Sequence, residues 1–190
     1  MRERSILFAR DMVLALRSGL KTQTRRLITP QPDRSHQNNG GPMRLEIGGR
    51  ELRFPFGAIG DRLLVREKWG YLRQFMERGA APGGPLVYAA DGAPRGAVAT
   101  PWKPSLHMPR SACRMTLEVT AARPERLREI TPEDARAEGC PPMLYEGPVE
   151  WFAEYWSRFN AERGFGWDAN PWVWVVGFRV LEDPTRMTGP

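Results

Sequence analysis

The chain has 190 residues, 41% of them hydrophobic and seven of them tryptophan, which is enough for one domain with a buried core but short for two. Its formal charge of +6 favours an anionic partner such as a nucleic acid or a nucleotide. Two distant cysteines without a Cys/His cluster, and no apolar run near the ~20 residues of a membrane span, argue against a zinc site, a disulfide framework and a membrane protein.

A short strand and a helix are predicted to open the chain. Residues 5–8 (SILF) have the character of a strand, and Asp11 is expected to cap a helix with one apolar face. Gly19 suits the left-handed residue that ends such a helix. Residues 29–58 are rich in turn formers, so we expect a long, mobile loop insertion there and place no site in it.

Three strands are predicted in the middle of the chain. In residues 60–69 (GDRLLVREKW), a Gly-Asp turn precedes an apolar run typical of a strand. A second insertion near residues 72–100 holds a Gly/Pro-rich loop and the short strand LVYAA. Residues 114–122 (RMTLEVTAA) alternate apolar and polar side chains, which indicates a half-buried strand.

Two helices and a strand are predicted to close the chain. Thr131 is expected to cap a short helix that Gly139 stops. Residues 149–163 repeat large apolar groups at helical spacing, so Phe159 is expected in the core with its neighbours. Residues 172–181 form a largely apolar strand.

The order of these elements favours a single α+β domain over residues 1–190 rather than a doubly wound sheet. We expect a small, partly closed barrel of mixed strands flanked by helices, in which the first and last strands are neighbours. Because the N-terminal sequence lacks the apolar core of a signal peptide, the expected location is the cytoplasm. Nothing in the sequence indicates an obligate protein partner.

The segment GLKTQTRR, residues 19–26, has two interpretations. It is either a solvated basic turn or a site on a loop that follows a helix. In the second case, Arg25 and Arg26 would help to lower the pKa of Lys21, so that Lys21 could act as a base. Thr24 would then be an activated nucleophile.

A carboxylic acid would be needed to protonate a departing amine, and three glutamates are candidates. Glu118 lies on the outward face of its strand and is expected at the surface. Glu67 follows Arg66, and an ion pair with a neighbouring arginine explains it. Glu138 lies in the last turn of a helix, where the dipole disfavours negative charge, so it is either exposed or kept for a task.

Four segments together resemble the ASCH domain family of the PUA-like superfamily, and especially its phage and prophage branch. They are SGLKTQTRR, GDRLLVREKW, ITPEDARAEG and NPWVWVVGFRV. The resemblance covers about residues 4–182 apart from loops near 33–55 and 72–100. It implies a small PUA-like pseudo-barrel with a basic cleft that admits a nucleobase or a nucleic acid.

One branch of that family removes the acetyl group from N4-acetylcytidine. The resemblance to its K-T-x-T segment implies Lys21 as base and Thr24 as nucleophile, and its T-x-x-x-A-x-x-E stretch implies Glu138 as acid. No metal or other cofactor is implied. Because this chain is much longer than the members of that branch, the expected partner is a modified pyrimidine nucleoside or a single-stranded nucleic acid.

Two alternatives stay open: a non-catalytic module that binds RNA or DNA, and a nuclease with a loosely held divalent ion near Asp61, Glu67 and Glu118. A ring such as that of Trp69 could stack on a base, and Arg110 could hold a phosphate together with Arg26 and Lys103. The candidate contacts to substrate or nucleic acid are Thr22, Arg25, Arg26, Arg66, Glu67, Trp69, Lys103 and Arg110.

Overall fold

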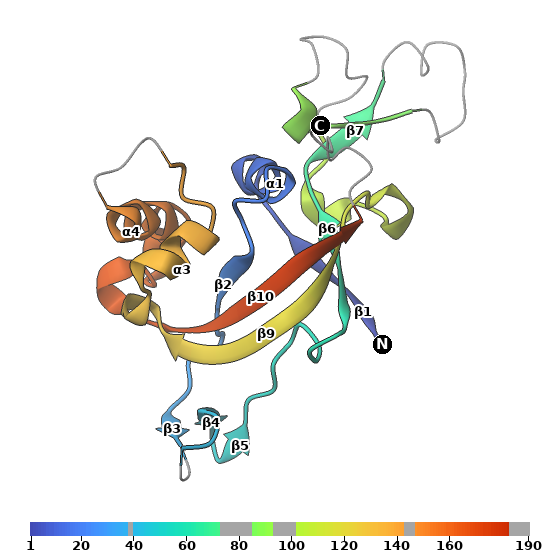
Figure 1. The fold of residues 1–190 in the computed structure, drawn as a ribbon. Helices are drawn as coiled ribbons and strands as arrows, with labels where there is room; N and C mark the ends of the chain where they lie inside the picture. The colour runs from blue at the N-terminus through green and yellow to red at the C-terminus, as the bar shows by residue number, and fades with distance from the viewer. Residues whose placement is uncertain (38–39, 73–84, 93–101, 143–146, 183–190) are drawn as a thin grey trace.

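Strands and helices are interspersed without regular βαβ alternation, which confirms the predicted α+β class. The computed structural model describes residues 1–37, 40–72, 85–92, 102–142 and 147–182 (Figure 1). The strands are β1 (Glu3–Leu7), β2 (Gln23–Leu27), β3 (Arg34–His36), β4 (Arg44–Ile47), β5 (Arg50–Glu51), β6 (Arg62–Arg66), β7 (Trp69–Tyr71), β8 (Leu86–Tyr88), β9 (Thr116–Arg126) and β10 (Trp172–Glu182). The α-helices are α1 (Arg10–Arg17), α3 (Pro132–Ala137) and α4 (Pro148–Asn160), and the short 3-10 helices are η1 (Ala89–Asp91), η2 (Ser105–His107), η3 (Arg110–Ala112), η4 (Leu127–Glu129), η5 (Ala161–Arg163) and η6 (Trp167–Ala169).

The main sheet is open. Its strand order is β1-β6-β9-β10-β2, with β1 and β6 parallel and the other neighbours antiparallel. The long strands β9 and β10 curve together through the middle of the molecule (Figure 1). The predicted pairing of the first and last strands is wrong, because β9 and β2 occupy the two sides of β10, while β1 pairs with β6 at the far edge.

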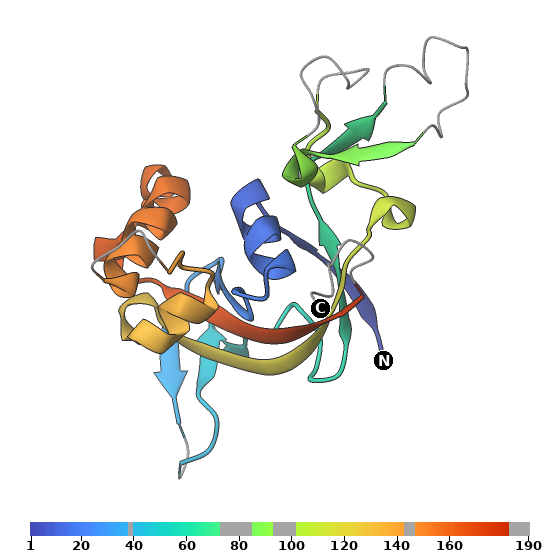
Figure 2. The same cartoon turned by 45° about the horizontal axis from the view of Figure 1, so that its top comes forward.

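Alternate side chains of β10 point to two separate hydrophobic clusters. Val173 and Val175 belong to the main core, which also contains residues of α1 and α4. Trp172 and Trp174 belong to a smaller cluster with Leu45 of β4. In both cartoon views, α1 and α4 accordingly lie on one side of β10 and the small sheet of β3, β4 and β5 lies on the other (Figures 1 and 2).

Three predictions about local structure need correction. The expected loop at 29–58 contains the three-stranded sheet β3-β4-β5, which buries Leu45 against the tryptophans of β10. The residue that caps α1 is Ala9, and Asp11 lies within the first turn. Phe159 is 53% exposed, because the end of α4 extends beyond the core that holds its earlier turns.

Other local predictions are confirmed. Gly19 and Gly139 both adopt left-handed backbone angles where α1 and α3 end, and the Thr131 hydroxyl accepts the N–H of Asp134 at the start of α3. Within the insertion near 72–100, β8 is a strand, while residues 73–84 and 93–100 lie outside the described part of the chain.

Candidate functional site

The chain segment after α1 is held against the end of α3. The N–H of Lys21 donates to the carbonyl of Ala15 at 3.0 Å, and the N–H of Thr22 donates to the carbonyl of Ala137 at 2.9 Å. Gly139 turns the chain away with φ of 101°. A Cβ at that position would lie 2.9 Å from the Cβ of Ala15, so the close approach requires glycine. These contacts place Lys21 directly beside Glu138.

Lys21 and Glu138 form a buried ion pair. The ammonium donates to Glu138 Oε2 at 2.9 Å and to the carbonyl oxygen of the same residue at 2.7 Å. Lys21 is only 2% exposed and Glu138 4%, so the solvated basic turn and the exposed glutamate are both wrong. Burial lowers the pKa of Lys21, although Glu138 opposes the shift.

Arg25 holds the other oxygen of the same carboxylate. Its Nη1 lies 3.2 Å from Glu138 Oε1, its Nε donates to Glu125 at 2.8 Å and its Nη2 donates to Asp134 at 2.7 Å. Arg123 contacts the same two partners, Glu125 and Asp134. The carboxylate of Glu138 therefore has a fixed orientation, with one cation at each oxygen.

Thr24 lies on β2, opposite Val176 of β10, and is 5% exposed. No hydrogen bond of its hydroxyl to another described residue is found. Thr24, Lys21 and Glu138 line one cavity of about 500 Å³, which we call the Lys21 cavity. The structure thus brings together the three residues that the sequence singles out, although Glu138 lies 117 residues after Lys21 along the chain.

The walls of the Lys21 cavity are cationic and aromatic. Phe8, Phe152, Tyr155, Trp156 and Phe159 contribute rings, and Lys21, Arg25, Arg26, Arg163 and Glu138 contribute charges, so positive groups outnumber negative ones. A cavity of this size and character suits a flat heterocycle with polar or anionic substituents.

Arg26 is the second arginine of this cavity. Its Nη2 donates to the carbonyl of Leu7 at 2.6 Å, and its guanidinium lies 4.9 Å from the ring centre of Phe8. Burial lowers its pKa. Its buried Nε–H has no hydrogen-bond partner among the described residues, which is a costly state unless a ligand supplies an acceptor.

The other predicted contacts lie outside this cavity. Thr22 is exposed beside it. Glu67 is buried and pairs with Arg114 at 2.8 and 3.0 Å, not with Arg66, whose Nη1 donates to the carbonyl of Leu106 at 3.1 Å. Burial raises the pKa of Glu67. The guanidinium of Arg114 also lies 3.9 Å from the ring centre of Tyr88 in β8, so this ion pair is next to the pair of strands β7 and β8, and neither of its members lines the Lys21 cavity.

Trp69, Lys103 and Arg110 also make their contacts away from the Lys21 cavity. Trp69 is 3% exposed, so its ring is part of a small core rather than a free stacking surface. The Lys103 ammonium lies 4.9 Å from the ring centre of Trp69 and 5.1 Å from that of Tyr71. Arg110 pairs with Glu3. The three cations proposed for one phosphate, Arg26, Lys103 and Arg110, therefore do not share a cavity.

The three acidic groups considered for a divalent ion are engaged separately. Asp61 accepts the N–H groups of Arg2 and Ala58, Glu67 pairs with Arg114, and Glu118 accepts from Arg179 at 2.8 Å. Within the described residues, no group of three or more His, Cys, Asp or Glu side chains is placed to bind a metal ion.

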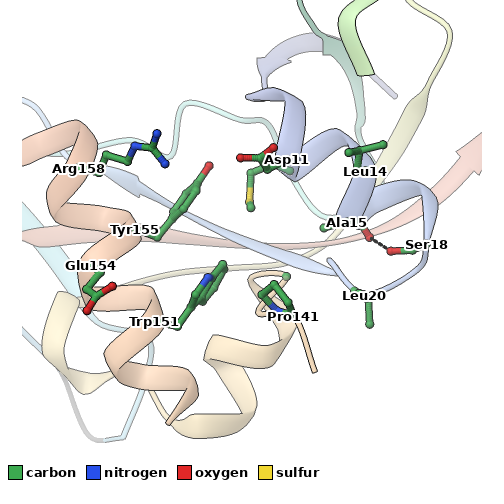
Figure 3. A pocket seen from close by; sticks show the side chains of 12 residues that line it. Asp11, Leu14, Ala15, Ser18, Leu20, Pro141, Trp151, Glu154, Tyr155 and Arg158 are labelled. Carbon is green, nitrogen blue, oxygen red and sulfur yellow. Dashed lines mark hydrogen bonds between the residues drawn. The ribbon is translucent and has the colours of Figure 1, made fainter. Parts of the chain in front are cut away.

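Sequence reasoning missed Tyr155 and the second cavity beside it. This cavity of about 650 Å³, which we call the Trp151 cavity, lies between α1 and α4 (Figure 3). Tyr155 and Met12 line both cavities. Burial raises the pKa of Tyr155 to about 12, so its phenol remains a donor at neutral pH. The signal was present in the sequence, since Tyr155 lies one turn after Trp151 and one turn before Phe159 on the predicted helix.

The fold and the site define an α+β protein with a buried Lys/Glu/Arg cluster that opens on an aromatic, cationic cavity. Two solved structures are similar in outline. A protein of the DUF984 family from Enterococcus faecalis V583 is 11% identical, with a TM-score of 0.46 over 100% of this chain and 86% of that chain. An ASCH domain from Lactobacillus crispatus JV V101 is 13% identical, with a TM-score of 0.41 over 94% of this chain and 79% of that chain.

The second of these structures belongs to the family that the sequence motifs resemble. No family model matches the chain, and no curated protein matches it in sequence. In the described part of the chain, no helix has the length and apolar character to span a membrane.

Proposed function

We propose that the protein hydrolyses the amide of an N4-acylated cytosine or a related modified nucleobase in the Lys21 cavity. The observation that carries this proposal is a buried lysine and glutamate in direct contact, on the wall of a cavity that also contains a threonine hydroxyl without a partner among the described residues. An amide hydrolase of this kind needs a base, a nucleophile and an acid within one small space.

The contact between Lys21 and Glu138 can supply the base and the acid together. Transfer of one proton from the ammonium to Glu138 Oε2, across 2.9 Å, converts the ion pair into a neutral amine and a carboxylic acid. Burial favours this exchange because it penalises charge, and it is also what lowers the pKa of Lys21. The total number of protons in the site does not change.

The steps follow from that neutral form. The amine of Lys21 takes the proton of the Thr24 hydroxyl as the oxygen attacks the acyl carbon. The tetrahedral intermediate collapses when Glu138 protonates the N4 nitrogen of the cytosine and the bond between this nitrogen and the acyl carbon breaks. The Glu138 carboxylate then deprotonates a water molecule, which attacks the acyl-threonine ester. The Lys21 ammonium returns its proton to the Thr24 oxygen as the carboxylic acid leaves, and this restores the neutral amine and the carboxylic acid of the starting state.

Arg26 is the candidate donor to the oxygen that becomes negative in the tetrahedral intermediate. Its Nε–H is buried without a hydrogen-bond partner in the described part of the chain, and the residue lines the cavity, so the donor is already desolvated before the charge develops. Arg25 has a different task, since it forms ion pairs with Glu125, Asp134 and Glu138, and its guanidinium thereby orients the carboxylate of Glu138.

The test is incubation of the protein with N4-acetylcytidine and other N4-acyl cytidines, followed by chromatography. We expect Thr24→Ala to lower kcat/KM by about 10³-fold, while Thr24→Ser, which keeps a hydroxyl, retains measurable turnover. Both variants should unfold at nearly the same temperature as the wild type. Full activity of Thr24→Ala, or no product with the wild type on any acyl cytidine, refutes the proposal.

A non-catalytic nucleic-acid module is the second candidate, and the surplus of positive charge around the Lys21 cavity favours it. Several phosphate contacts would make the affinity for an oligonucleotide fall steeply with salt. Binding with such a salt dependence, together with no turnover of any N4-acyl cytidine, would select this candidate.

A further inference from the structure

We propose that the Trp151 cavity binds the base and sugar of the nucleotide next to the reacting one, so that the substrate is a single-stranded nucleic acid rather than a free nucleoside. This inference rests on the proposed function and names its substrate class. Its first support is contiguity: Tyr155 and Met12 form a wall shared by the two cavities, so ligands that fill both are neighbours.

The second support is the chemistry of the cavity. The rings of Trp151 and Tyr155 stack at 5.5 Å with 19° between their planes, and Leu14, Leu20 and Pro141 provide an apolar wall. Asp11 and Glu154 add carboxylates, which accept hydrogen bonds from sugar hydroxyls or exocyclic amines. A neutral, flat group with donors at its edges fits these walls, whereas a bare phosphate does not.

The third support is the boundary between the cavities. Tyr155 points from α4 into the space between Arg158 and Asp11 (Figure 3). Its hydroxyl has no hydrogen-bond partner among the described residues and its pKa of about 12 keeps it protonated. Arg158 is exposed at the same place. A phosphate that joins two nucleotides would therefore meet one neutral and one charged donor at this boundary.

The size of the site agrees with two nucleotides. The Lys21 cavity of about 500 Å³ and the Trp151 cavity of about 650 Å³ each lie in the range that accommodates a small organic ligand. A free nucleoside bound at Thr24 would occupy the first cavity and would not contact Arg158 or Asp11, which line the Trp151 cavity and not the Lys21 cavity.

The experiment compares N4-acetylcytidine with a short single-stranded oligonucleotide that carries one N4-acetylcytidine. We expect the wild type to have at least about tenfold higher kcat/KM on the oligonucleotide, in line with the effect of stacking one base. Arg158→Gln, and Leu14→Trp, which fills the cavity from the exposed side of α1, should each remove most of this preference and leave the nucleoside reaction unchanged. Arg128→Gln is the matched control, because Arg128 is exposed and lines neither cavity.

Equal turnover of both substrates by the wild type, or an equal loss on both substrates in the two variants, overturns the inference and leaves the proposed function intact. If neither substrate turns over, the proposed function fails and binding decides the inference. In that case, fluorescence anisotropy with an unmodified single-stranded oligonucleotide should show about tenfold weaker binding for Arg158→Gln than for Arg128→Gln. Indistinguishable affinities of these two variants then overturn the inference as well.

Discussion

At the scale of single residues, we expect a large loss of stability when a substitution breaks the contact of Lys21 with Glu138. Removing one member leaves a buried charge with incomplete compensation, so Lys21→Met should lower the free energy of unfolding by about 3 kcal/mol. Double substitution with Glu138→Gln should cost less than the sum of the single changes, because the two side chains interact directly. Urea unfolding of the three variants measures this coupling.

An exposed ion pair provides the control for that cycle. Arg179 contacts Glu118 at 2.8 Å on the surface of the main sheet. Because solvent screens such a pair, Arg179→Met should cost less than about 1 kcal/mol. If Lys21→Met and Arg179→Met lose the same free energy of unfolding, burial does not make the Lys21–Glu138 ion pair more costly to break than an exposed one.

The phenol of Tyr155 gives the protein a pH dependence at its alkaline end. Burial raises the pKa of Tyr155 from 10.0 to about 12, so between these values the folded protein keeps a proton that the unfolded chain releases. The contribution of Tyr155 to stability is therefore fully present below pH 10 and is lost as the pH rises toward 12.

Tyr155→Phe removes this group and keeps the ring. We expect the stability advantage of the wild type over Tyr155→Phe, measured by urea unfolding, to shrink as the pH rises through that window. The difference in phenolate absorbance between the two proteins should show one tyrosine that titrates near pH 12. If the tyrosine that distinguishes the wild type from Tyr155→Phe titrates near pH 10 instead, the phenol is not buried.

At the scale of elements, the end of α3 determines where Glu138 lies. Gly139 and Gly164 both adopt positive φ, at 101° and 79°, but only Gly139 faces a close neighbour, since nothing lies within 4 Å of a Cβ at Gly164. Gly164→Ala should therefore cost only the backbone strain of about 1 kcal/mol. Gly139→Ala should cost at least about twice as much, because its Cβ would press on Ala15, and it should also reduce turnover.

Thermal unfolding and the amide-hydrolysis assay check this pair of variants. Adding Ala15→Gly to Gly139→Ala should restore part of the activity by removing the clash, although glycine in a helix itself costs about 1 kcal/mol. If Gly139→Ala behaves like Gly164→Ala in both assays, the close packing of α3 against α1 is not what positions the site.

The local signals around Glu138 could be predicted from the sequence, but its surroundings could not. Thr131 as a cap and Gly139 as a stop are short-range patterns, and both are confirmed. The partners of Arg25 come from β9 and α3, and no local pattern encodes such a pairing. Glu125 was missed because β9 continues beyond residue 122, where the predicted strand ends.

Predictions from helical and strand periodicity are wrong in two places, for related reasons. The 3.6-residue repeat assigned Phe159 to the same face as Trp156, but it cannot tell where the core under a helix ends. Conversely, Met43, Leu45 and Ile47 alternate with Arg44 and Glu46 around β4, but this run spans only five residues between turn formers. Leu45 is the one residue of the three that becomes fully buried. Both outcomes depend on tertiary neighbours rather than on the segment itself.

At the scale of the whole molecule, the two hydrophobic clusters on either side of β10 separate stability from activity. Leu45 and Leu16 are each 1% exposed, and each would leave a cavity if shortened. Leu45→Ala and Leu16→Ala should therefore each lower the free energy of unfolding by about 2 to 5 kcal/mol. Leu45 packs in the cluster beneath the small sheet, whereas Leu16 packs in the main core on α1, next to the Ala15 carbonyl that holds Lys21.

The two variants should thus differ in function although their chemistry and burial are the same. At a temperature where both proteins are folded, Leu45→Ala should keep the kcat/KM of the wild type, while Leu16→Ala should lose activity because the shifted helix no longer supports Lys21 and the shared wall at Met12. Circular dichroism fixes the folded fraction and the N4-acyl cytidine assay reports the rate. An equal loss of activity in both would mean that the small sheet of β3, β4 and β5 is coupled to the site across β10, and that the two cores are not independent.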